Sequence, residues 1–443
     1  MQWWVRSGGS QTNGGGFDAT VSGSGINYAD RDTAIGSASN FATPSAGSTT
    51  LTSASNPFTS GMIGNVIRFS AGTNFATGHY VITGYTSSSQ VTLDRSPTAS
   101  AAGSGGVGSI GGALLDLRSF ATSSSAGGGD LPAFAAPVAA GHVINFRCST
   151  SLADPSTPDW TTSNYYTFPA GNTTGGSIRL IGYNGRPLIS ALSLWFYQTS
   201  GWHFTSISIK SSGVGAVANF FNTCDLMIFE DCIFDQNGVD MGACGDNSYA
   251  ALGCLVRNSG STSAGISAAF PSGSYGDKII GCRIDGWRGP AITVGSVSGS
   301  VLRNVIANCH CSGGAVQLTD ASFTTPALVM HNVFYNNASH GLEITQVNPA
   351  FMSVIRNNIF WGNGGYGIKY LASTGDSFAR GKCDYNALGS NTSGAYSNFT
   401  GGTHDVVLTG DPFTNAAAKD FSLNNAAGAG AVCKSVGWPL TIP

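Results

Sequence analysis

Short hydrophobic runs recur along the second half of the chain at a nearly constant interval. Each run places one large hydrophobic residue in the same position, and a second hydrophobic residue follows it, usually after a glycine. The first column is Phe234, Val256, Ile284, Ile306, Phe334 and Phe360, and the second is Val239, Ile266, Ile292, Val316, Leu342 and Ile368. Two columns that keep the same phase predict an internal repeat of about 25 residues.

A repeat of this length, built from short strands between Gly and Asn turns, favours a β-solenoid. It is too short for a propeller blade of roughly 40 residues, and it lacks a leucine-rich signature. In a solenoid each coil lays its strands on those of the previous coil, about 4.8 Å away, so equivalent residues form ladders along the axis. The spacings within the first column predict coils of 22 to 28 residues.

A third column lies two residues before the first and predicts a structural ladder. It consists of Cys232, Cys254, Cys282, Asn304, Asn332 and Asn358. A thiol packs in an interior as a small apolar group, and stacked asparagines satisfy one another's amide hydrogen bonds. The ladder accounts for the cysteines without disulfides or a metal. The triplet Cys309-His310-Cys311 is too tight for one tetrahedral zinc site.

The region before the repeats has a different pattern and divides the chain into three parts. Between residues 47 and 95, four strand-like segments alternate with turns, and residues 96–112 are rich in Ser, Ala and Gly. We expect residues 1–46 to form the N-terminal cap and first strands of the solenoid, and residues 47–112 an inserted small β module with its linker. Residues 113–443 would form the solenoid and its closing coil.

Composition agrees with an all-β chain. Of 443 residues, 62 are Gly and only 10% are charged, which disfavours a helical bundle, while 42% are hydrophobic, enough to bury a core. The net charge of −3 disfavours binding to nucleic acid. No apolar run is long enough to span a membrane, and the start lacks the pattern of a secretory signal. We therefore expect no membrane insertion and no export through a signal peptide.

Three segments resemble parts of right-handed parallel β-helices of the pectate-lyase-like superfamily. They are the opening WVRSGGSQTNGG from Trp4, in which Gln11 replaces the usual Asp, the early coil SIRLIGYNGRP from Ser177, and the closing GDPF and KDFSL. The resemblance implies an all-β, right-handed parallel β-helix. The strands between residues 47 and 95 resemble modules of phage-encoded β-helix proteins. This fold carries lyases, hydrolases and non-catalytic virion parts, so it does not determine activity.

Alternation along the strands predicts an outward apolar stripe. It consists of Ile233, Leu255, Val305, Val333 and Ile359, with Arg283 between Leu255 and Val305. Monomers avoid contiguous exposed apolar patches, so the stripe predicts an interface with a neighbouring chain. Threefold self-association is what the resemblance to phage β-helices implies. A corner inside these short runs would instead turn the stripe inward.

The next outward column contains the charged residues Asp235, Arg257 and Asp285. Two carboxylates at a suitable separation could cleave a glycan, but opposite charges on neighbouring strands more often form ion pairs. Further candidate groups are Asp231 with Asp240 and Asp246, His331 with His340 and Glu343, and Lys369 with Lys382 and Asp384. The sets expected of a polygalacturonase-like or pectate-lyase-like enzyme are incomplete, and no calcium cluster is visible.

Aromatic residues could also stack on sugar rings, although in a solenoid most large rings belong to the core or an interface. The candidates are Trp287, Tyr335, Trp361, Tyr366 and Tyr370.

The sequence therefore predicts a structural protein of a phage virion surface, a trimeric capsid-decorating, cement or short tailspike-like β-helix. Its partners would be two further copies of the chain, other capsid or tail proteins and a host surface glycan, and no cofactor is implied. The alternative is a glycan-cleaving depolymerase, and a third class is a secreted adhesin. A groove with two or more acids would favour the depolymerase.

Overall fold

The computed structural model describes most of the chain, which divides into two compact units. The described residues are 1–21, 25–124, 131, 135–149, 158–162, 165–169, 171, 176–191, 195–197, 200–211, 218–219, 221–222, 225–235, 241–242, 248–258, 270, 277–295, 299–319, 326–345, 353–371, 383–398, 400–435 and 437. The first unit comprises residues 1–190 and 199–208, and the second comprises residues 191–198 and 209–443.

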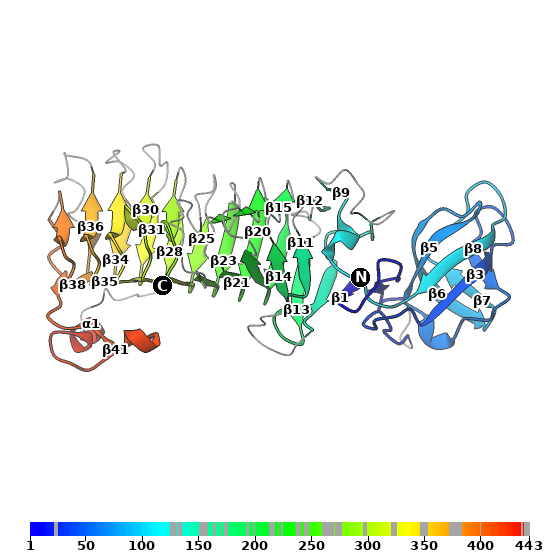
Figure 1. Ribbon diagram of the computed structural model, residues 1–443, viewed down its shortest axis with the longest axis horizontal. Coiled ribbons are helices and arrows are strands. Elements are labelled where there is room, and N and C mark those ends of the chain that lie inside the picture. Colours follow the sequence, from blue (N-terminus) through cyan, green and yellow to red (C-terminus); the bar gives the residue numbers. More distant parts are fainter. Residues whose placement is uncertain are drawn as a thin grey trace, which may run out of the picture. The chain divides into compact units, whose positions relative to one another are not determined.

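The first unit contains a small closed barrel of antiparallel strands (Figure 1). Its strands, in barrel order, are β3 (Gly36–Ala42), β4 (Thr50–Ser53), β7 (Gln90–Leu93), β6 (Gly78–Ser87), β5 (Val66–Thr73) and β8 (Ser104–Ile110). Side chains that alternate along these strands fill the interior, among them Phe41, Phe69 and Ile82, all with no exposed surface. Closure leaves no unpaired sheet edge in the module.

The barrel extends beyond the inserted module predicted for residues 47–112 at one end, and its last strand runs through the predicted linker. Strand β3 begins at Gly36, but only Phe41 in it is buried, so its sequence shows no alternation. Strand β8 is rich in glycine because large rings pack on it. A Cβ atom at Gly106 would lie 2.9 Å from the Phe75 ring, and one at Gly108 would lie 3.0 Å from Phe69.

The first unit also contains the opening coils of the β-helix. Strands β1 (Gln2–Arg6), β10 (Val143–Arg147), β13 (Ile178–Tyr183) and β16 (Trp202–Thr205) pair in parallel and in register, and β2 (Gly16–Phe17) pairs antiparallel to β1. Trp3, Ile144, Leu180 and Phe204 form one fully buried column across these strands. The opening segment identified by its sequence thus supplies the first strand of the solenoid.

Smaller elements occur in both units between residues 60 and 242. They are the 3-10 helices η1 (Ser60–Met62) and η2 (Leu117–Phe120) and strands β9 (Ser123–Ser124), β11 (Trp160–Thr162), β12 (Tyr165–Thr167), β14 (Leu188–Ala191), β15 (Trp195–Tyr197), β17 (Ser208–Ser211), β18 (Ala218–Asn219), β19 (Phe221–Asn222) and β22 (Met241–Gly242).

Three parallel sheets form the solenoid of the second unit (Figure 1). The first sheet contains β20 (Asp225–Glu230), β23 (Ser248–Leu252), β25 (Lys278–Ile280), β28 (Ser300–Leu302), β31 (Leu328–Met330), β34 (Val354–Arg356) and β37 (Cys383–Asp384). The second contains β21 (Ile233–Asp235), β24 (Leu255–Arg257), β26 (Arg283–Asp285), β29 (Val305–Ala307), β32 (Val333–Tyr335), β35 (Ile359–Trp361), β38 (Ala387–Gly389) and β40 (Val406–Val407). The third contains β27 (Ile292–Val294), β30 (Gly314–Leu318), β33 (His340–Ile344), β36 (Tyr366–Tyr370) and β39 (Gly394–Ser397).

The hydrophobic columns found in the sequence form the interior of these coils. The first column, from Phe234 to Phe360, is in register along the second sheet and has no exposed surface. In the third sheet, Ile292, Val316, Leu342 and Ile368 pair in the same way, whereas Val239 and Ile266 lie outside the described residues. The predicted fold, an all-β right-handed parallel β-helix with a small β module near its N-terminus, is confirmed.

A sharp corner of two residues joins each strand of the first sheet to the next strand of the second. Its first residue always has a positive φ angle, and its second belongs to the predicted Cys and Asn ladder, which Asn386 extends by one coil. The positive-φ residues are Asp231, Gly253, Gly281, Arg303, His331, Asn357 and Tyr385. Left-handed backbone costs a non-glycine residue roughly 1 kcal/mol, so most of these corners carry some strain that the coil stacking must offset.

The last described part of the chain folds back along the second sheet. It contains β41 (Phe413–Asn415), the 3-10 helix η5 (Ala416–Ala418), β42 (Asp420–Leu423) and α1 (Gly430–Ser435), and we call residues 411–435 the closing segment. Tyr335 packs edge-on against Phe413 and Phe421 at 5.7 and 5.4 Å. Among the described residues, none of the helices has the length and apolar character needed to cross a membrane.

Candidate functional site

The predicted ladder is a continuous chain of hydrogen bonds inside the corner. From Asn332 onward, each asparagine accepts through Oδ1 from the backbone nitrogen and the Nδ2 of the asparagine one coil earlier, as Asn332 does from Asn304 at 3.0 Å in both contacts. The pattern continues through Asn358 to Asn386. In the earlier coils Cys254 and Cys282 direct their thiols at backbone carbonyls. Among the described cysteines, Cys232 included, none forms a disulfide.

A second ladder runs parallel to the first, five residues later in each coil. Asn337, Asn363 and Asn391 repeat the same bonds, and Asn337 begins the ladder by accepting from the backbone nitrogen of Cys309. The sequence analysis missed these residues, although the spacing from Asn332 to Asn337 recurs from Asn358 to Asn363 and from Asn386 to Asn391. Buried amides are thus satisfied on both sides of the second sheet.

The proposed interface stripe does not form an exposed patch. Ile233 is 4% exposed, and Leu255, Val305, Val333 and Ile359 are half-buried. Part of the stripe faces the closing segment. Val333 and Ile359 line a cavity of about 380 Å³ together with Leu423 and Cys433, which come from that segment. Arg283, within the stripe, lies with its guanidinium carbon 5.6 Å from the ring centre of Phe421.

The charged column forms ion pairs. The Nε atom of Arg257 donates to Oδ2 of Asp235 at 3.1 Å, and Asp235 is 2% exposed. Asp285 is the acceptor for three groups: Arg283 at 3.2 Å, Asn308 at 2.9 Å and Lys419 of the closing segment at 2.8 Å. With Arg257 between them in register, Asp235 and Asp285 are two strand spacings apart, about 10 Å.

These contacts determine the charge state of Asp285. Burial would raise the pKa of its carboxyl, but the hydrogen bonds of Lys419 and Asn308 and the charges of Lys419 and Arg283 lower that pKa below its usual value. A general acid in glycan cleavage needs a raised pKa. Asp285 is therefore suited to holding the closing segment on the second sheet and unsuited to donating a proton at neutral pH.

Other predicted candidates fall into separate places. His340 and Glu343 share β33, and Lys369 lies on β36 beside them, with its Nζ atom 3.8 Å from Oε2 of Glu343. His331 is at the corner between β31 and β32. The Nδ1 atom of His340 accepts from the backbone nitrogen of Tyr366 at 2.9 Å, and burial and the charge of Lys369 lower the pKa of His340. Asp240, Asp246 and Lys382 lie outside the described residues.

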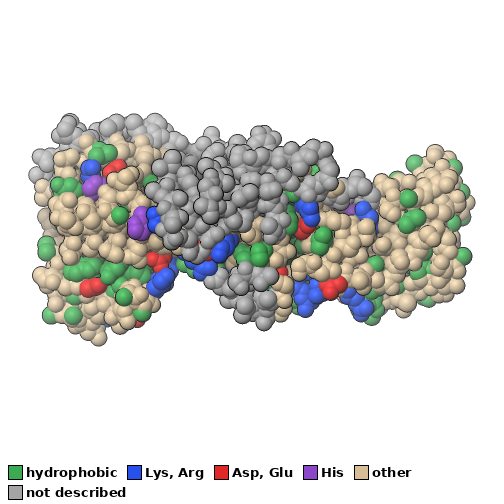
Figure 2. Space-filling model, in the orientation of Figure 1, with side chains coloured by type: hydrophobic (Ala, Val, Ile, Leu, Met, Phe, Trp, Pro, Cys, Tyr) green, Lys and Arg blue, Asp and Glu red, His purple; other side chains and the backbone are tan. Residues whose placement is uncertain are grey.

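Most of the aromatic candidates are buried or pack against other residues of the fold. Trp287 is completely buried and Tyr370 is 5% exposed. Tyr335 lies under the closing segment, where its hydroxyl donates to Asp411 at 3.2 Å, and Tyr366 stacks on His340. Trp361 is half-buried at the end of β35. Charged side chains are few on the part of the surface that is coloured by type in Figure 2, where most of the atoms are backbone, uncharged polar or hydrophobic.

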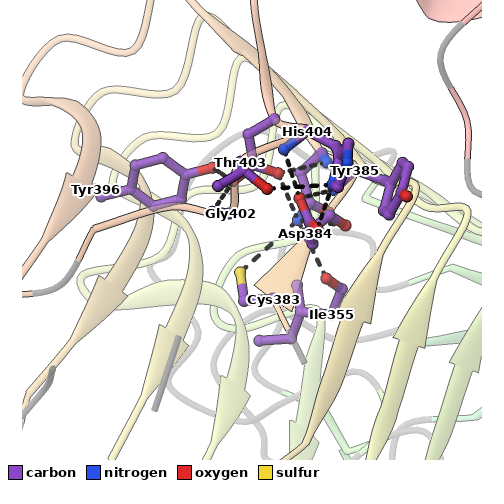
Figure 3. Close-up of polar contacts among 10 residues, drawn as sticks. Ile355, Cys383, Asp384, Tyr385, Tyr396, Gly402, Thr403 and His404 are labelled. Carbon is purple, nitrogen blue, oxygen red and sulfur yellow. Dashed lines mark hydrogen bonds and ion pairs between the residues drawn. The ribbon is translucent and has the colours of Figure 1, made fainter. Parts of the chain in front are cut away.

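The polar cluster best suited to acid–base chemistry lies at the last coil and joins Asp384 to His404 (Figure 3). Oδ2 of Asp384 is 2.8 Å from Nδ1 of His404, and Oδ1 accepts from the backbone nitrogens of His404 and Tyr385, both at 2.9 Å. The imidazole stacks on the Tyr385 ring at 4.4 Å with an interplanar angle of 4°. The imidazole is thus held on one edge and one face while 56% of the His404 side chain stays exposed.

Glycines make this arrangement possible. A Cβ atom at Gly402 would lie 2.3 Å from Oδ1 of Asp384, and one at Gly401 would lie 2.4 Å from the ring of Tyr396. The backbone therefore runs directly against the carboxylate. Sequence reasoning grouped Asp384 with Lys369 and missed His404, because the two partners are twenty residues apart in a coil that departs from the repeat.

Asp405, next to His404, terminates the first ladder. Its Oδ1 accepts from the backbone nitrogen of Asn386 at 2.7 Å, and its Oδ2 accepts from the Tyr396 hydroxyl at 2.5 Å and the Gly402 nitrogen at 2.6 Å. No ladder residue follows Asp405 to accept a hydrogen bond from it. A carboxylate, which only accepts hydrogen bonds, therefore fits this position.

The two neighbouring carboxylates have pKa values displaced in opposite directions. Burial, with a contribution from the charge of Asp384, raises the pKa of Asp405 despite its three hydrogen bonds. For Asp384 burial acts in the same direction, but the hydrogen bonds from His404 and Tyr385 outweigh it and lower the pKa. Asp384 is thus ionised at neutral pH, so Nδ1 of His404 carries the proton and donates it. The Nε2 atom is then the nitrogen available to take up a proton.

Within the part of the chain that the structure describes, no group of three His, Cys, Asp or Glu side chains is arranged to hold a metal ion. The Asp384–His404 pair offers two possible ligands and no third. Its chemistry is that of an oriented acid–base residue.

One protein-family model matches part of the chain. Residues 193–383 match a family described as "Right handed beta helix region". No curated protein matches the sequence. Among solved structures, the catalytic domain of a GH87 alpha-1,3-glucanase in complex with nigerose is similar at 11% identity, covering 84% of this chain and 90% of that chain, with a TM-score of 0.31. A rhamnogalacturonan lyase is similar at 14% identity over 58% of this chain and 67% of that chain, with a TM-score of 0.31. The family match coincides with the coils described above, so this chain contains a right-handed β-helix region.

Proposed function

We propose that the protein is a structural component of a phage virion surface, of the capsid-decorating or short tailspike kind, in which the β-helix is a rigid support and the barrel is a docking module. The observation that carries this proposal is the use of the solenoid's polar side chains for its own cohesion. Two asparagine ladders, the Arg257–Asp235 pair and the groups around Asp285 are engaged within the fold.

Such cohesion suits a protein that must persist outside a cell. Each coil is bonded to the next through backbone ladders and side-chain ladders, so partial unfolding of one coil exposes unsatisfied amides in its neighbours. Resistance of this kind appears as a slow unfolding rate. The closing segment adds to it, because Lys419 and Asp411 attach that segment to the second sheet through Asp285 and Tyr335.

The test is the native mass of the full chain, measured by light scattering with and without reductant. A trimer that reductant does not change supports the assembly. Charge placed at half-buried positions of the stripe, in Leu255→Asp and Val305→Asp, should then yield monomers. Leu328→Asp, at a half-buried position on the first sheet, is the matched control and should remain trimeric. A monomeric wild-type protein, or equal dissociation of the control, would overturn the proposal.

The second candidate function is glycan cleavage, and the Asp384–His404 pair favours it. The imidazole is exposed, its tautomer is fixed by an ionised carboxylate, and it lies on a rigid coil. In such a reaction Nε2 would take a proton from the sugar or from an attacking water, and Asp384 would stabilise the resulting imidazolium.

A panel of polysaccharides distinguishes this candidate. Release of reducing ends indicates hydrolysis, and an ultraviolet-absorbing unsaturated product indicates elimination. Activity that is lost in His404→Gln and Asp384→Asn but kept in His310→Gln, an exposed histidine of the same unit, would establish the pair as the site. Activity unaffected by the first two variants would exclude it.

A further inference from the structure

A small polar cavity in the first unit is built from residues that neither proposed function uses. It has a volume of about 260 Å³ and is lined mainly by Arg6, Ser7, Asp32, Arg147, Ser149 and Asn184. These residues come from the ends of β1, β10 and β13 and from the loop that contains Asp32. A water molecule occupies roughly 30 Å³, so the cavity is large enough for one small organic ring.

The charged groups of the cavity are fixed by one another. Nε of Arg6 lies 2.7 Å from Oδ1 of Asp32, and its Nη1 donates to the carbonyl of Asp30 at 2.8 Å. Arg147 donates from Nη1 to Oδ2 of Asp30 at 2.6 Å. Two guanidinium groups thus face two carboxylates, and their charges balance. A site of this kind offers donors and acceptors side by side without selecting for an anion or a cation.

Backbone geometry keeps the Asp32 carboxylate at the cavity. A Cβ atom at Gly8 would lie 2.6 Å from Oδ1 and 3.0 Å from Oδ2 of Asp32. Glycine at this position therefore lets the main chain approach the carboxylate closely. Any side chain here would displace the carboxylate from Arg6 and change the cavity wall.

An exposed aromatic ring lies beside Arg147, one of the residues that line the cavity. Tyr183 directly precedes Asn184. Tyr183 is 46% exposed, more than Tyr85 at 37%. Trp4 meets its ring edge-on at 5.0 Å, and the guanidinium carbon of Arg147 is 5.9 Å from its centre. The ring is held in place by these two contacts while much of its surface faces solvent.

We propose that this cavity binds a neutral sugar residue, with the hydroxyl groups of the sugar bonded by Arg6, Asp32 and Arg147 and an apolar face of the sugar on Tyr183. Vicinal hydroxyls donate and accept at once, so they match alternating guanidinium and carboxylate groups. The C–H face of a sugar ring packs on an aromatic surface, which Tyr183 supplies. The balanced charge gives phosphate or a uronate no advantage over a neutral sugar.

The full chain can be tested by saturation-transfer NMR and isothermal titration calorimetry. The probes are glucose, galactose, mannose and N-acetylglucosamine, with glucuronate and inorganic phosphate as charged comparisons. At least one neutral sugar should bind in the millimolar range and more tightly than either anion. Tyr183→Ala should weaken binding about tenfold, a loss typical of one stacking contact. Asp32→Asn should weaken it as well.

Tyr85→Ala is the matched control, because Tyr85 is an exposed tyrosine of the barrel, 37% exposed. It should leave binding unchanged, and an unchanged melting temperature of Tyr183→Ala will show that this surface variant is folded. The proposal is overturned by the absence of neutral-sugar binding, by a preference for phosphate or glucuronate, or by affinity that Tyr183→Ala leaves intact. None of these outcomes depends on the oligomeric state or on activity at His404.

Discussion

The Oδ1 atom of Asn358 lies 3.0 Å from both the backbone nitrogen and the Nδ2 atom of Asn332, so one side chain binds two donors of the preceding coil. The same relationship joins Asn332 to Asn304. Removing one member therefore leaves donors unsatisfied in one coil and an acceptor unsatisfied in another. This makes the ladder a sensitive point for stability.

We predict that Asn332→Ala destabilises the second unit by roughly 2–4 kcal/mol, because buried donors lose their acceptor and a small void forms. Asn304→Cys should cost less, because it extends the run of thiols from Cys232 to Cys282. Unfolding rates in denaturant, followed by tryptophan fluorescence, measure both variants. Equal effects of the two substitutions would contradict the argument.

The contacts of Asp285 predict a pH dependence. Its pKa is lowered in the fold, so its ionised form contributes stability that is complete above the ordinary carboxyl pKa of about 3.9 and is lost as pH falls through the folded value. Asp285→Asn should unfold faster than wild type at pH 7, and the difference should shrink in acid. Lys419→Ala should reproduce part of the effect. Unfolding rates measured from pH 7 down to about pH 3 test this, and a constant difference across that range would refute it.

The corner at Gly281 predicts a purely conformational effect. Its φ angle is +66°, and an added Cβ atom would meet only the backbone nitrogen of Gly253, 4.0 Å away. Gly281→Ala should therefore cost about 1 kcal/mol from left-handed backbone alone, and Gly281→Asn should cost less. Thermal melting of the two variants measures the difference. A neutral alanine would show that the corner relaxes.

The closing segment should be released by removing its aromatic anchor. Phe421 packs on Tyr335 at 5.4 Å and on Phe413 at 5.2 Å, and Arg283 lies over its ring. In Phe421→Ala, limited proteolysis should cut residues 411–435 much sooner than in wild type while the coils remain intact. Thr414→Ala, an exposed position of the same hairpin, serves as the control. Equal cleavage of both variants would argue against the anchor.

The solenoid could be predicted from sequence because its determinants repeat. Phe234 and Phe360 occupy equivalent interior positions, and the Cys and Asn ladder lies two residues before each of these positions, so one pattern reports on every coil. Strand β8 could not be recognised, since its glycines accommodate Phe75 and Phe69 across the barrel, and that requirement is invisible along the chain.

The candidate site was hidden for a similar physical reason. Asp384 and His404 meet only because β37 and the turn before β40 are the last parts of the coils, where the repeat no longer applies. Asp285 was found, but its partner Lys419 comes from the closing segment, far along the chain. Contacts of this kind depend on where distant segments of the chain pack against the coils. The local pattern of hydrophobic and polar residues does not encode that packing.

The two-residue corner also determines where this chain can be lengthened. In the second unit, every passage from the first sheet to the second, such as His331 and Asn332, uses a left-handed residue followed by a ladder residue. An added residue there would shift the ladder and turn the next strand inside out. The passages from the third sheet back to the first differ in length from coil to coil, as between β27 and β28 and between β36 and β37. Guest peptides for display or affinity capture belong in those passages, where the repeat already accepts variable length.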